Sequence, residues 1–393
     1  MTTALSGASA LAYWRTPPLV RALTNPSDEG AGLPITEKRL FQLRRDVYQE
    51  LEVWRNSSVL SSRGRPIGSQ VGLDVLDTIA RIAPSVELPI EVLIPSRAER
   101  RYSGLIKPQV MSPDLTADKL RRISKSLSVA SPALTLLTLA PRLTLAELVM
   151  LASELCGAFS LYRVPPSLAS LLEELNRERL LPRVSSWAPS FDRDGSLTNL
   201  WSRPPLTTPA ELAELARQAK GRRGARALAR AAELVVAGAA SPFEVQAGML
   251  LGLPDSLGGE GYSGFSHNYE LALNASARRL AGRGTCRCDL YWPASEGHRA
   301  LDLECQSRLF HVGIESGLSD ADRATALQSM GVEVLLVTYA QFSEVARFDA
   351  LSAAVAEKIG RTPPAHTREF LGARKELRSQ VLVRWEDLLA GSS

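Results

Sequence analysis

Two short stretches decide the fold of the second half of the chain: Cys288–Pro293, which reads CDLYWP, and Leu301–Gln306, which reads LDLECQ. Both contain residues that favour strands, and the turn-prone residues 293–297 between them let the chain double back. The pattern therefore predicts a β-hairpin. Such a hairpin would bring Asp289 on the first strand beside Glu304 on the second.

The second strand is expected to have one polar face and one apolar face. Side chains alternate along a strand, so Asp302, Glu304 and Gln306 share one face, while the leucines and Cys305 point into a core on the other. A hard divalent cation such as Mg2+ prefers oxygen ligands, keeps several waters and usually takes one or two protein carboxylates. The pair of Asp289 and Glu304 therefore predicts a magnesium site.

The composition fits a multidomain globular protein. A chain of 393 residues with 45% hydrophobic residues can bury two or three cores of ordinary size. Basic and acidic residues nearly balance, at 46 against 42, so only local basic groups could mark a nucleic-acid binder. Residues 1–18 lack a basic segment followed by a sustained apolar one, and no apolar run approaches the length of a membrane span. We therefore expect neither secretion nor membrane insertion.

The four cysteines do not make a disulfide framework, and three of them, Cys286, Cys288 and Cys305, fall on the expected strands. A cytoplasmic protein with reduced thiols is the simplest interpretation. A structural zinc site would combine these thiols with His298 or His311, but zinc clusters usually place cysteines two to four residues apart in knuckles. Buried thiols are therefore favoured over zinc.

Changes of pattern along the chain predict five regions. Residues 1–35 are rich in Ser, Thr, Gly and Pro, which indicates a weakly ordered leader, and residues 36–163 form a mixed helical and β region. Residues 164–205 lack steady periodicity and are expected to be a linker. An α/β (α+β) domain is expected over residues 206–350, followed by a helical tail over residues 351–393.

Several motifs follow one another between residues 241 and 345. They are Ser241-Pro242-Phe243-Glu244 on a leading helix, Asp289 and Glu304 on successive strands, His311, Ser319–Arg323 opening a helix, and the closing strand Gly331–Thr338. In this order and spacing the chain resembles the restriction-endonuclease-like superfamily, in particular the branch similar to the very-short-patch repair endonuclease. The resemblance implies a C-terminal domain with a central mixed sheet flanked by helices.

The resemblance also implies a metal-dependent nuclease that hydrolyses phosphodiester bonds of DNA, in phage defence or in a toxin-antitoxin module. Carried over by position, Asp289 and Glu304 bind the catalytic Mg2+ (or Mn2+), and Glu244 is a possible third ligand. His311 and Arg323 become accessory residues. Gln306 stands where the family most often has a lysine, and its amide can orient the attacking water but cannot act as a base.

Several of these residues also have a structural interpretation. Glu244 is three positions after Ser241, so it can close a capping box. Arg323 can pair with Asp320 or with the sheet, and Asp302 is expected to be a polar surface residue.

Two basic groups are candidate phosphate-binding surfaces, and a solvated surface explains each about equally well. They are Arg97, Arg100 and Arg101, and the helical stripe of Arg222, Arg226 and Arg230. The competing hypothesis for the whole chain is a catalytically silent DNA-binding or regulatory protein that uses a nuclease-like domain as a scaffold.

Overall fold

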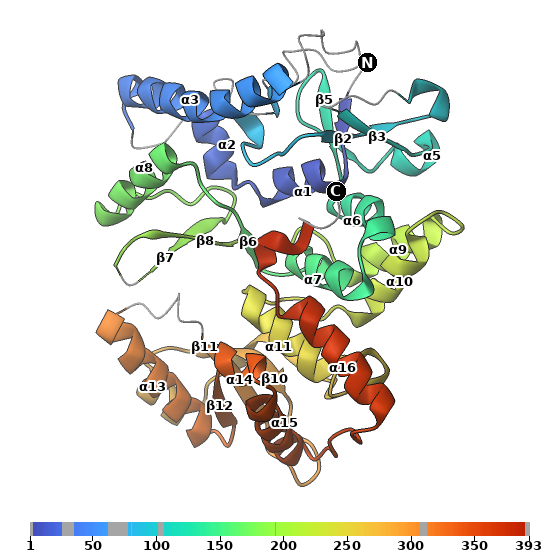
Figure 1. The fold of residues 1–393 in the computed structure, drawn as a ribbon. Coiled ribbons are helices and arrows are strands. Elements are labelled where there is room, and N and C mark those ends of the chain that lie inside the picture. Colours follow the sequence, from blue (N-terminus) through green and yellow to red (C-terminus); the bar gives the residue numbers. More distant parts are fainter. Residues whose placement is uncertain are drawn as a thin grey trace. The chain divides into compact units, whose positions relative to one another are not determined.

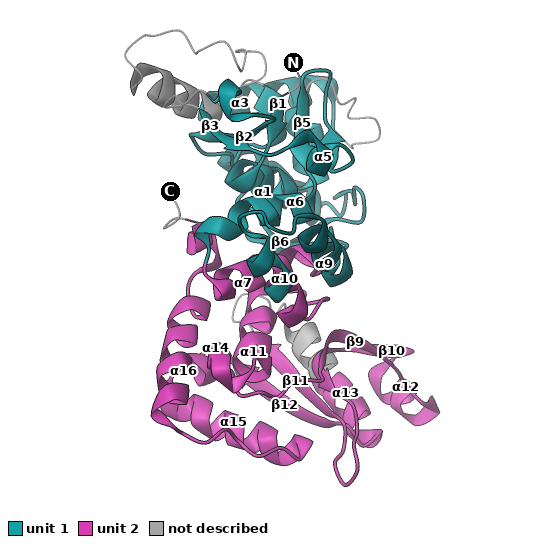
Figure 2. Ribbon diagram, turned by 90° about the vertical axis from the view of Figure 1, so that its right-hand side faces the viewer, with its two compact units in different colours: residues 1–143, 160–190, 195–230 teal, residues 144–159, 191–194, 231–393 magenta. Residues whose placement is uncertain are grey.

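The computed structural model describes residues 3–25, 35–61, 78–79, 81–100, 106–192, 194–306 and 313–389. The chain divides into two compact units, which Figure 2 colours separately. Unit 1 comprises residues 1–143, 160–190 and 195–230, and unit 2 comprises residues 144–159, 191–194 and 231–393. No helix in these described ranges is both long and apolar enough to cross a bilayer.

Unit 1 is built on a five-stranded sheet whose middle strand comes from the N-terminal residues (Figure 1). Strand β1 (Thr3–Leu5) pairs in parallel with β5 (Leu127–Ala130) and antiparallel with β2 (Ile90–Ile94). Strands β3 (Ile106–Val110) and β4 (Leu120–Arg122) complete the order β3-β2-β1-β5-β4. Helices α1 (Gly7–Arg15) and α6 (Pro132–Leu139) pack on each other and contact this sheet.

The weakly ordered leader expected over residues 1–35 is wrong for its described part. Residues 3–25 form β1, α1 and α2 (Pro18–Thr24), and both helices bury their leucines. The small residues that suggested disorder allow close packing instead. The Ser9 hydroxyl accepts a hydrogen bond from the Glu91 backbone N–H at 2.9 Å, and Gly7, at φ +51°, lies where the Glu91 carboxylate leaves no room for a side chain.

The linker expected over residues 164–205 is also wrong. This stretch contains α8 (Pro166–Arg177), β7 (Ala188–Phe191) and β8 (Leu197–Ser202), and the two strands join β6 (Phe159–Leu161) in the order β6-β8-β7. Leucines recur at helical spacing along α8 and form one apolar cluster with the fully buried Trp201. The prolines at the start of α8 mark its first turn, where the missing N–H costs nothing.

Three further helices of unit 1 are α3 (Glu37–Ser61), α5 (Pro113–Thr116) and α9 (Pro209–Gln218). Helix α10 (Ala225–Leu234) crosses the division between the units near residue 230. Residues 206–230, which were expected to open the C-terminal domain, therefore belong with unit 1.

Unit 2 is built on a four-stranded mixed sheet in the order β12-β11-β10-β9. Strand β10 (Thr285–Trp292) pairs antiparallel with both β9 (Ser266–Ala272) and β11 (Leu301–Gln306), and β12 (Glu333–Thr338) is parallel to β11. The predicted hairpin is confirmed, since β10 pairs with β11. The expected closing strand is β12, which completes the sheet.

The helices of unit 2 come from segments before, between and after the strands of its sheet. Helices α12 (Ala275–Ala281) and α13 (Gly313–Ser329) contribute alanines and a leucine to the cluster around Cys286 and Cys288 of β10. Helix α11 (Pro242–Gly252) contacts β10 and β11. Helix α16 (Arg368–Val381) contacts α7 (Leu145–Leu155) and α11, so the C-terminal residues complete this unit instead of forming a separate tail. Helices α14 (Tyr339–Ser343) and α15 (Val345–Ile359) lie between β12 and α16 in the chain.

Candidate active site

The regular alternation of side chains along β10 breaks at Asp289. Cys286, Cys288 and Tyr291 all join the same apolar cluster, although a regular strand would turn Tyr291 to the opposite face. Opposite Asp289 on β9, Asn268 adopts a left-handed backbone conformation with φ +49°, which asparagine tolerates better than most residues. The sheet is therefore locally irregular where the predicted ligand lies.

The Asp289 side chain accepts a hydrogen bond that a backbone carbonyl would accept in a regular β-ladder. The pairing of β10 with β11 covers Leu290–Trp292 and Leu301–Leu303, so Asp289 and Glu304 lie one step beyond its end. At that step the Asp289 carboxylate accepts a hydrogen bond of 2.8 Å from the backbone N–H of Cys305. The side chain is partly exposed and tied to β11.

Asp302 is fully buried, which overturns the expectation that it is a surface residue. It is 0% exposed, and neither carboxylate oxygen has a hydrogen-bond partner among the described residues. The Cys288 thiol and the Glu304 carboxyl are close enough to affect its pKa but lie outside hydrogen-bonding geometry. Burial, followed by the nearby Asp289 carboxylate, raises the pKa of Asp302.

Glu304 is 5% exposed, and its two carboxylate oxygens lie in different environments. Its Oε2 accepts a hydrogen bond and ion pair from the Arg323 guanidinium of α13. Its Oε1 is buried and has no hydrogen-bond partner within the described ranges. Burial, and then the Asp302 carboxyl, raises the pKa of Glu304, whereas Arg323 lowers it. Arg323 and the Asp302 carboxyl therefore act on the pKa of Glu304 in opposite directions.

Glu244 is held by three donors. Its carboxylate accepts hydrogen bonds from the Ala240 N–H at 2.7 Å, the Ser241 hydroxyl at 2.8 Å and the Asn268 amide at 2.7 Å. Ser241 also caps α11 through the Glu244 N–H. Burial, and then the Asp289 carboxylate, raises the pKa of Glu244 against these bonds. The expected capping box is therefore wrong, because the Glu244 carboxylate bonds the Ala240 N–H and the Ser241 hydroxyl and not the Ser241 N–H. Glu244 instead supports Asn268, the residue opposite Asp289.

The three strand cysteines are reduced and have no thiolate character. Burial is the largest cause that raises the pKa of Cys286, Cys288 and Cys305, and the surrounding carboxylates raise it further. Thiols of this kind suit the buried-thiol interpretation better than zinc ligation.

The remaining predicted residues lie at several places. Gln306 is partly buried at the end of β11, opposite Thr338 of β12, and His311 falls outside the described residues. The exposed members of the two basic groups all lie in unit 1, whereas the carboxylates lie in unit 2, and Arg101 falls outside the described residues. The exposed members are Arg97, Arg100, Arg222, Arg226 and Arg230.

A basic segment of unit 2 escaped the sequence analysis. Residues 271–288 contain four arginines and no Lys, His, Asp or Glu. All four are exposed, two on α12 and two on or just before β10: Arg278, Arg279, Arg283 and Arg287. The signal was present in the sequence as a local charge excess, but it is diluted by the near balance of the whole chain.

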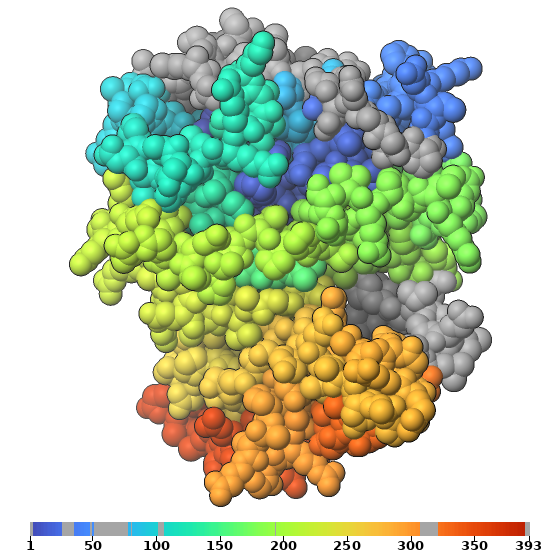
Figure 3. Space-filling view, turned by 180° about the vertical axis from the view of Figure 1, so that it is seen from behind, coloured from blue at the N-terminus to red at the C-terminus, as the bar shows by residue number. Residues whose placement is uncertain are grey.

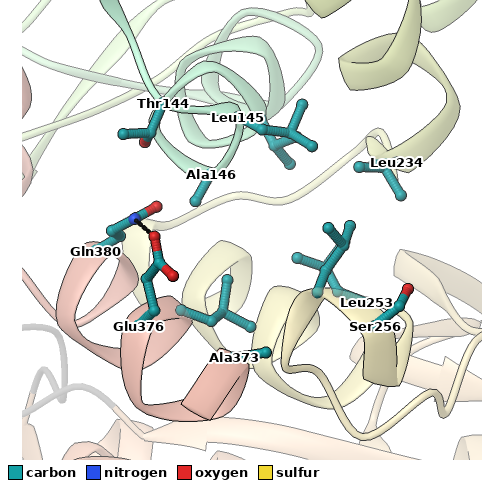
Figure 4. A pocket seen from close by; sticks show the side chains of 12 residues that line it. Thr144, Leu145, Ala146, Leu234, Leu253, Ser256, Ala373, Glu376 and Gln380 are labelled. Carbon is teal, nitrogen blue, oxygen red and sulfur yellow. Dashed lines mark hydrogen bonds between the residues drawn. The ribbon is translucent and has the colours of Figure 1, made fainter. Parts of the chain in front are cut away.

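A separate cavity of about 230 Å³ also lies in unit 2 (Figure 4). Its lining is mostly apolar, and Glu376 is its one charged side chain, hydrogen-bonded to Gln380 at 3.2 Å. None of the carboxylates on β10 and β11 lines it. The cavity therefore lacks the groups that phosphate chemistry requires, and the strand carboxylates remain the candidate site.

Within the described ranges, no three His, Cys, Asp or Glu side chains are arranged to hold a metal ion as they stand. No family model, curated protein or solved structure matches this chain.

Proposed function

We propose that unit 2 is a metal-dependent nuclease domain of the restriction-endonuclease-like kind, which hydrolyses phosphodiester bonds of DNA. The observation that carries this proposal is the group of buried carboxylates at the irregular junction of β10 and β11. Three carboxylate oxygens of Asp302 and Glu304 are buried with no hydrogen-bond partner among the described residues. Buried charges are stable when they are paired or coordinate a metal, so these oxygens fit a cation.

Asp289, Asp302 and Glu304 would hold the ion, because they offer the hard oxygen ligands that Mg2+ or Mn2+ prefers. When bound, such an ion polarises a phosphoryl oxygen and lowers the pKa of a coordinated water. Glu244 is already satisfied by three donors, so its role is to fix Asn268 opposite Asp289. In this proposal Glu244 positions Asn268 and does not bind the metal, whereas the resemblance implied that Glu244 is a third ligand.

Arg323 and Gln306 supply the other polar groups near the carboxylates. Arg323 compensates the charge of Glu304, and a guanidinium in this position is also suited to contact a phosphate. The Gln306 amide can orient a water by hydrogen bonding, but it has no group that takes up a proton. Proton removal in this proposal therefore depends on a carboxylate or on solvent.

The wider role follows from resemblance alone. A cytoplasmic nuclease of this kind would act in phage defence or in a toxin-antitoxin module, an assignment by analogy with a family.

A catalytically silent nucleic-acid-binding or regulatory protein is the second candidate, and a specific contact favours it. The Arg323 guanidinium occupies one side of Glu304, where a metal-binding carboxylate would need to be accessible. Gln306 in place of a basic residue points the same way. In this alternative the ion pair replaces the metal and the sheet acts as a scaffold.

Plasmid nicking in Mg2+ or Mn2+ separates the two candidates. The proposal predicts that Asp289→Asn and Glu304→Gln each lower the nicking rate at least about 100-fold. Glu296→Gln, at an exposed position in the same hairpin, is the matched control and should leave the rate unchanged. Equal residual nicking by all four proteins would indicate a contaminant and favour the silent alternative.

A further inference from the structure

The connection between helices α9 and α10 of unit 1 is rich in arginine and lysine. Residues 215–230 contain six basic residues and no Asp or Glu, and all six basic side chains are exposed. Figure 3 shows this segment, in yellow-green, at the molecular surface. The six residues are Arg217, Lys220, Arg222, Arg223, Arg226 and Arg230.

Four of these residues, which lie within seven positions of the chain, carry positive charge that no acid neutralises. Lys220, Arg223 and Arg226 form no side-chain hydrogen bond or ion pair among the described residues. Arg222 donates a hydrogen bond of 2.7 Å to the Ser112 hydroxyl, which is a neutral partner. Lys220, Arg222, Arg223 and Arg226 are therefore grouped as the basic turn.

The backbone of the basic turn is closely packed against the rest of unit 1. Two glycines at positive φ, Gly221 and Gly224, bracket its two central arginines. A side chain at Gly224 would lie 3.0 Å from the Leu137 carbonyl oxygen, so the turn contacts the end of α6 without room to spare. The Arg222 N–H also donates a hydrogen bond of 2.9 Å to the Ala219 carbonyl. The four cations are thus displayed from a compact, well-supported turn.

The segment that adjoins the basic turn does not cancel its charge. Arg222 contacts Ser112, and the residues after Ser112 include two acids and one lysine. Lys119 pairs with Asp118, so Asp114 is the acid of residues 112–119 that no ion pair neutralises in the described structure. Four positive charges against one negative charge leave a net positive area.

The residues around the basic turn decide which polyanion it suits. Helix α9, the turn and α10 contain no aromatic residue, whereas single-stranded nucleic acids are held by stacking of their bases on aromatic rings. Among the described residues, none of the exposed large apolar side chains lies on these elements, whereas a membrane-bound segment buries such side chains in the lipid. The remaining partner is the regularly spaced phosphates of a double helix.

We propose that the basic turn binds the phosphate backbone of double-stranded DNA without reading its sequence. A duplex carries one negative charge per about 1.7 Å of its axis, so several phosphates lie within reach of four neighbouring cations. The residues between the cations are glycine and alanine, which offer no side-chain hydrogen bonds to base edges. The inference rests on the proposed nuclease function and names unit 1 as the unit that holds the duplex.

Binding is measured by fluorescence anisotropy of a labelled duplex, with the full-length protein in EDTA over a series of salt concentrations. The triple variant Lys220→Ala/Arg223→Ala/Arg226→Ala should bind the duplex at least about 10-fold more weakly at low salt. Its dependence of log affinity on log salt should also be shallower by about 2.7, since each lost phosphate contact contributes about 0.9.

Two further variants separate phosphate contact from other effects. Arg163→Ala/Arg177→Ala/Arg183→Ala removes three exposed arginines around α8, which lies across unit 1 from α9 (Figure 1), and should change neither quantity. A variant that exchanges lysine and arginine at the three positions of the basic turn keeps its charge. This variant should bind the duplex within about 3-fold of the parent, because phosphate contact depends on charge.

Four outcomes would overturn the proposal. Unchanged duplex binding in the triple variant, or an equal loss in the α8 control, would show that the basic turn is not the binding surface. Tighter binding to a single strand of the same length, lost in the triple variant, would refute the choice of a duplex. Loss of binding to phosphatidylserine vesicles with intact duplex binding would assign the turn to a membrane surface.

Failure of this inference is distinguishable from failure of the proposed function. Salt-sensitive duplex binding in EDTA that depends on the basic turn supports the inference even if the protein never nicks DNA. Metal-dependent nicking, together with full duplex affinity in the triple variant, supports the nuclease and refutes the role of the basic turn.

Discussion

Replacing Asp302 by asparagine should stabilise the metal-free protein, which is the reverse of the usual effect of changing a buried residue. Asp302 is 0% exposed, both its oxygens are without hydrogen-bond partners in the described part of the chain, and the buried Glu304 carboxyl lies nearby. A buried, unsatisfied polar group costs about 1–3 kcal/mol. Asparagine has nearly the same shape, carries no charge, and can donate an N–H to the unpaired Oε1 of Glu304.

The expected gain for Asp302→Asn is therefore about 1–3 kcal/mol in the free energy of unfolding, measured by thermal or urea denaturation near neutral pH. A unit of this size changes its Tm by roughly 2–4 °C per kcal/mol. Asp387→Asn, at an exposed position of the same unit, is the matched control and should stay within about 0.5 kcal/mol of the parent.

The pH dependence of this gain gives a second test. The pKa of Asp302 is raised in the folded protein, so the native state binds a proton more tightly than the unfolded state. The parent therefore loses stability as pH rises above the ordinary aspartate pKa of 3.8 and up through the raised pKa, whereas Asp302→Asn does not. The gain should vanish in acid and be complete above the raised pKa.

Metal addition completes the test. Mg2+ or Mn2+ should raise the Tm of the parent and have a smaller effect on Asp302→Asn, because a ligand of the folded state stabilises it by mass action. A loss of more than about 1 kcal/mol in metal-free Asp302→Asn at neutral pH would refute the reasoning, since the carboxylate would then be a satisfied structural group.

Three further predictions concern the framework of unit 2. Burial lowers the pKa of His267 from 6.5 to about 4, so the folded state favours the neutral imidazole. The free energy of unfolding should therefore fall as pH drops from 6.5 to 4, by roughly 3 kcal/mol in acid denaturation. The loss should be smaller in His267→Gln. Gly258→Ala should cost at least about 2 kcal/mol in urea denaturation, because the new Cβ would lie 2.4 Å from backbone atoms, whereas Gly297→Ala, also at positive φ but facing open space, should cost about 1 kcal/mol. Asn268→Ala should lower the free energy of unfolding by about 1–3 kcal/mol, because it removes a hydrogen bond to the buried Glu244 carboxylate and places alanine at φ +49°; an unchanged Tm would contradict the positioning role of this residue.

The sequence predicted the hairpin, the closing strand and the alternation of Asp302 and Glu304 with the leucines, because all of these depend on local pattern and turn chemistry. It did not predict that the polar face of β11 is buried. That face is covered by α13, whose packing depends on residues far along the chain, and a strand pattern does not say whether a polar face meets solvent or a helix. The same limit applies to the missed break at Asp289, which lies opposite the left-handed backbone of Asn268 on the neighbouring strand.

The prediction for the N-terminal region was wrong for a different reason. Ser, Gly and Ala near residues 6–10 are typical of loops, but they are also the residues that allow a helix and a strand to approach closely. The buried Glu91 carboxylate fills the space beside Gly7 and pairs with Arg142. Composition alone does not separate these two uses of small residues, because the partner that fills the space lies more than eighty residues away in the sequence.

The buried carboxylates of β11 support the proposed cation site in unit 2. A pure scaffold would gain stability from apolar or amide residues at these positions, since replacing a buried charged group by a neutral one of similar shape is often stabilising. The chain instead places several acids close together: Asp289 raises the pKa of both Glu244 and Asp302, and Asp302 raises that of Glu304. Both carboxylate oxygens of Asp302 and the Oε1 of Glu304 have no hydrogen-bond partner among the described residues. A divalent cation would supply the partner that these oxygens lack, so the same carboxylates that weaken the metal-free fold are the ones expected to bind the ion.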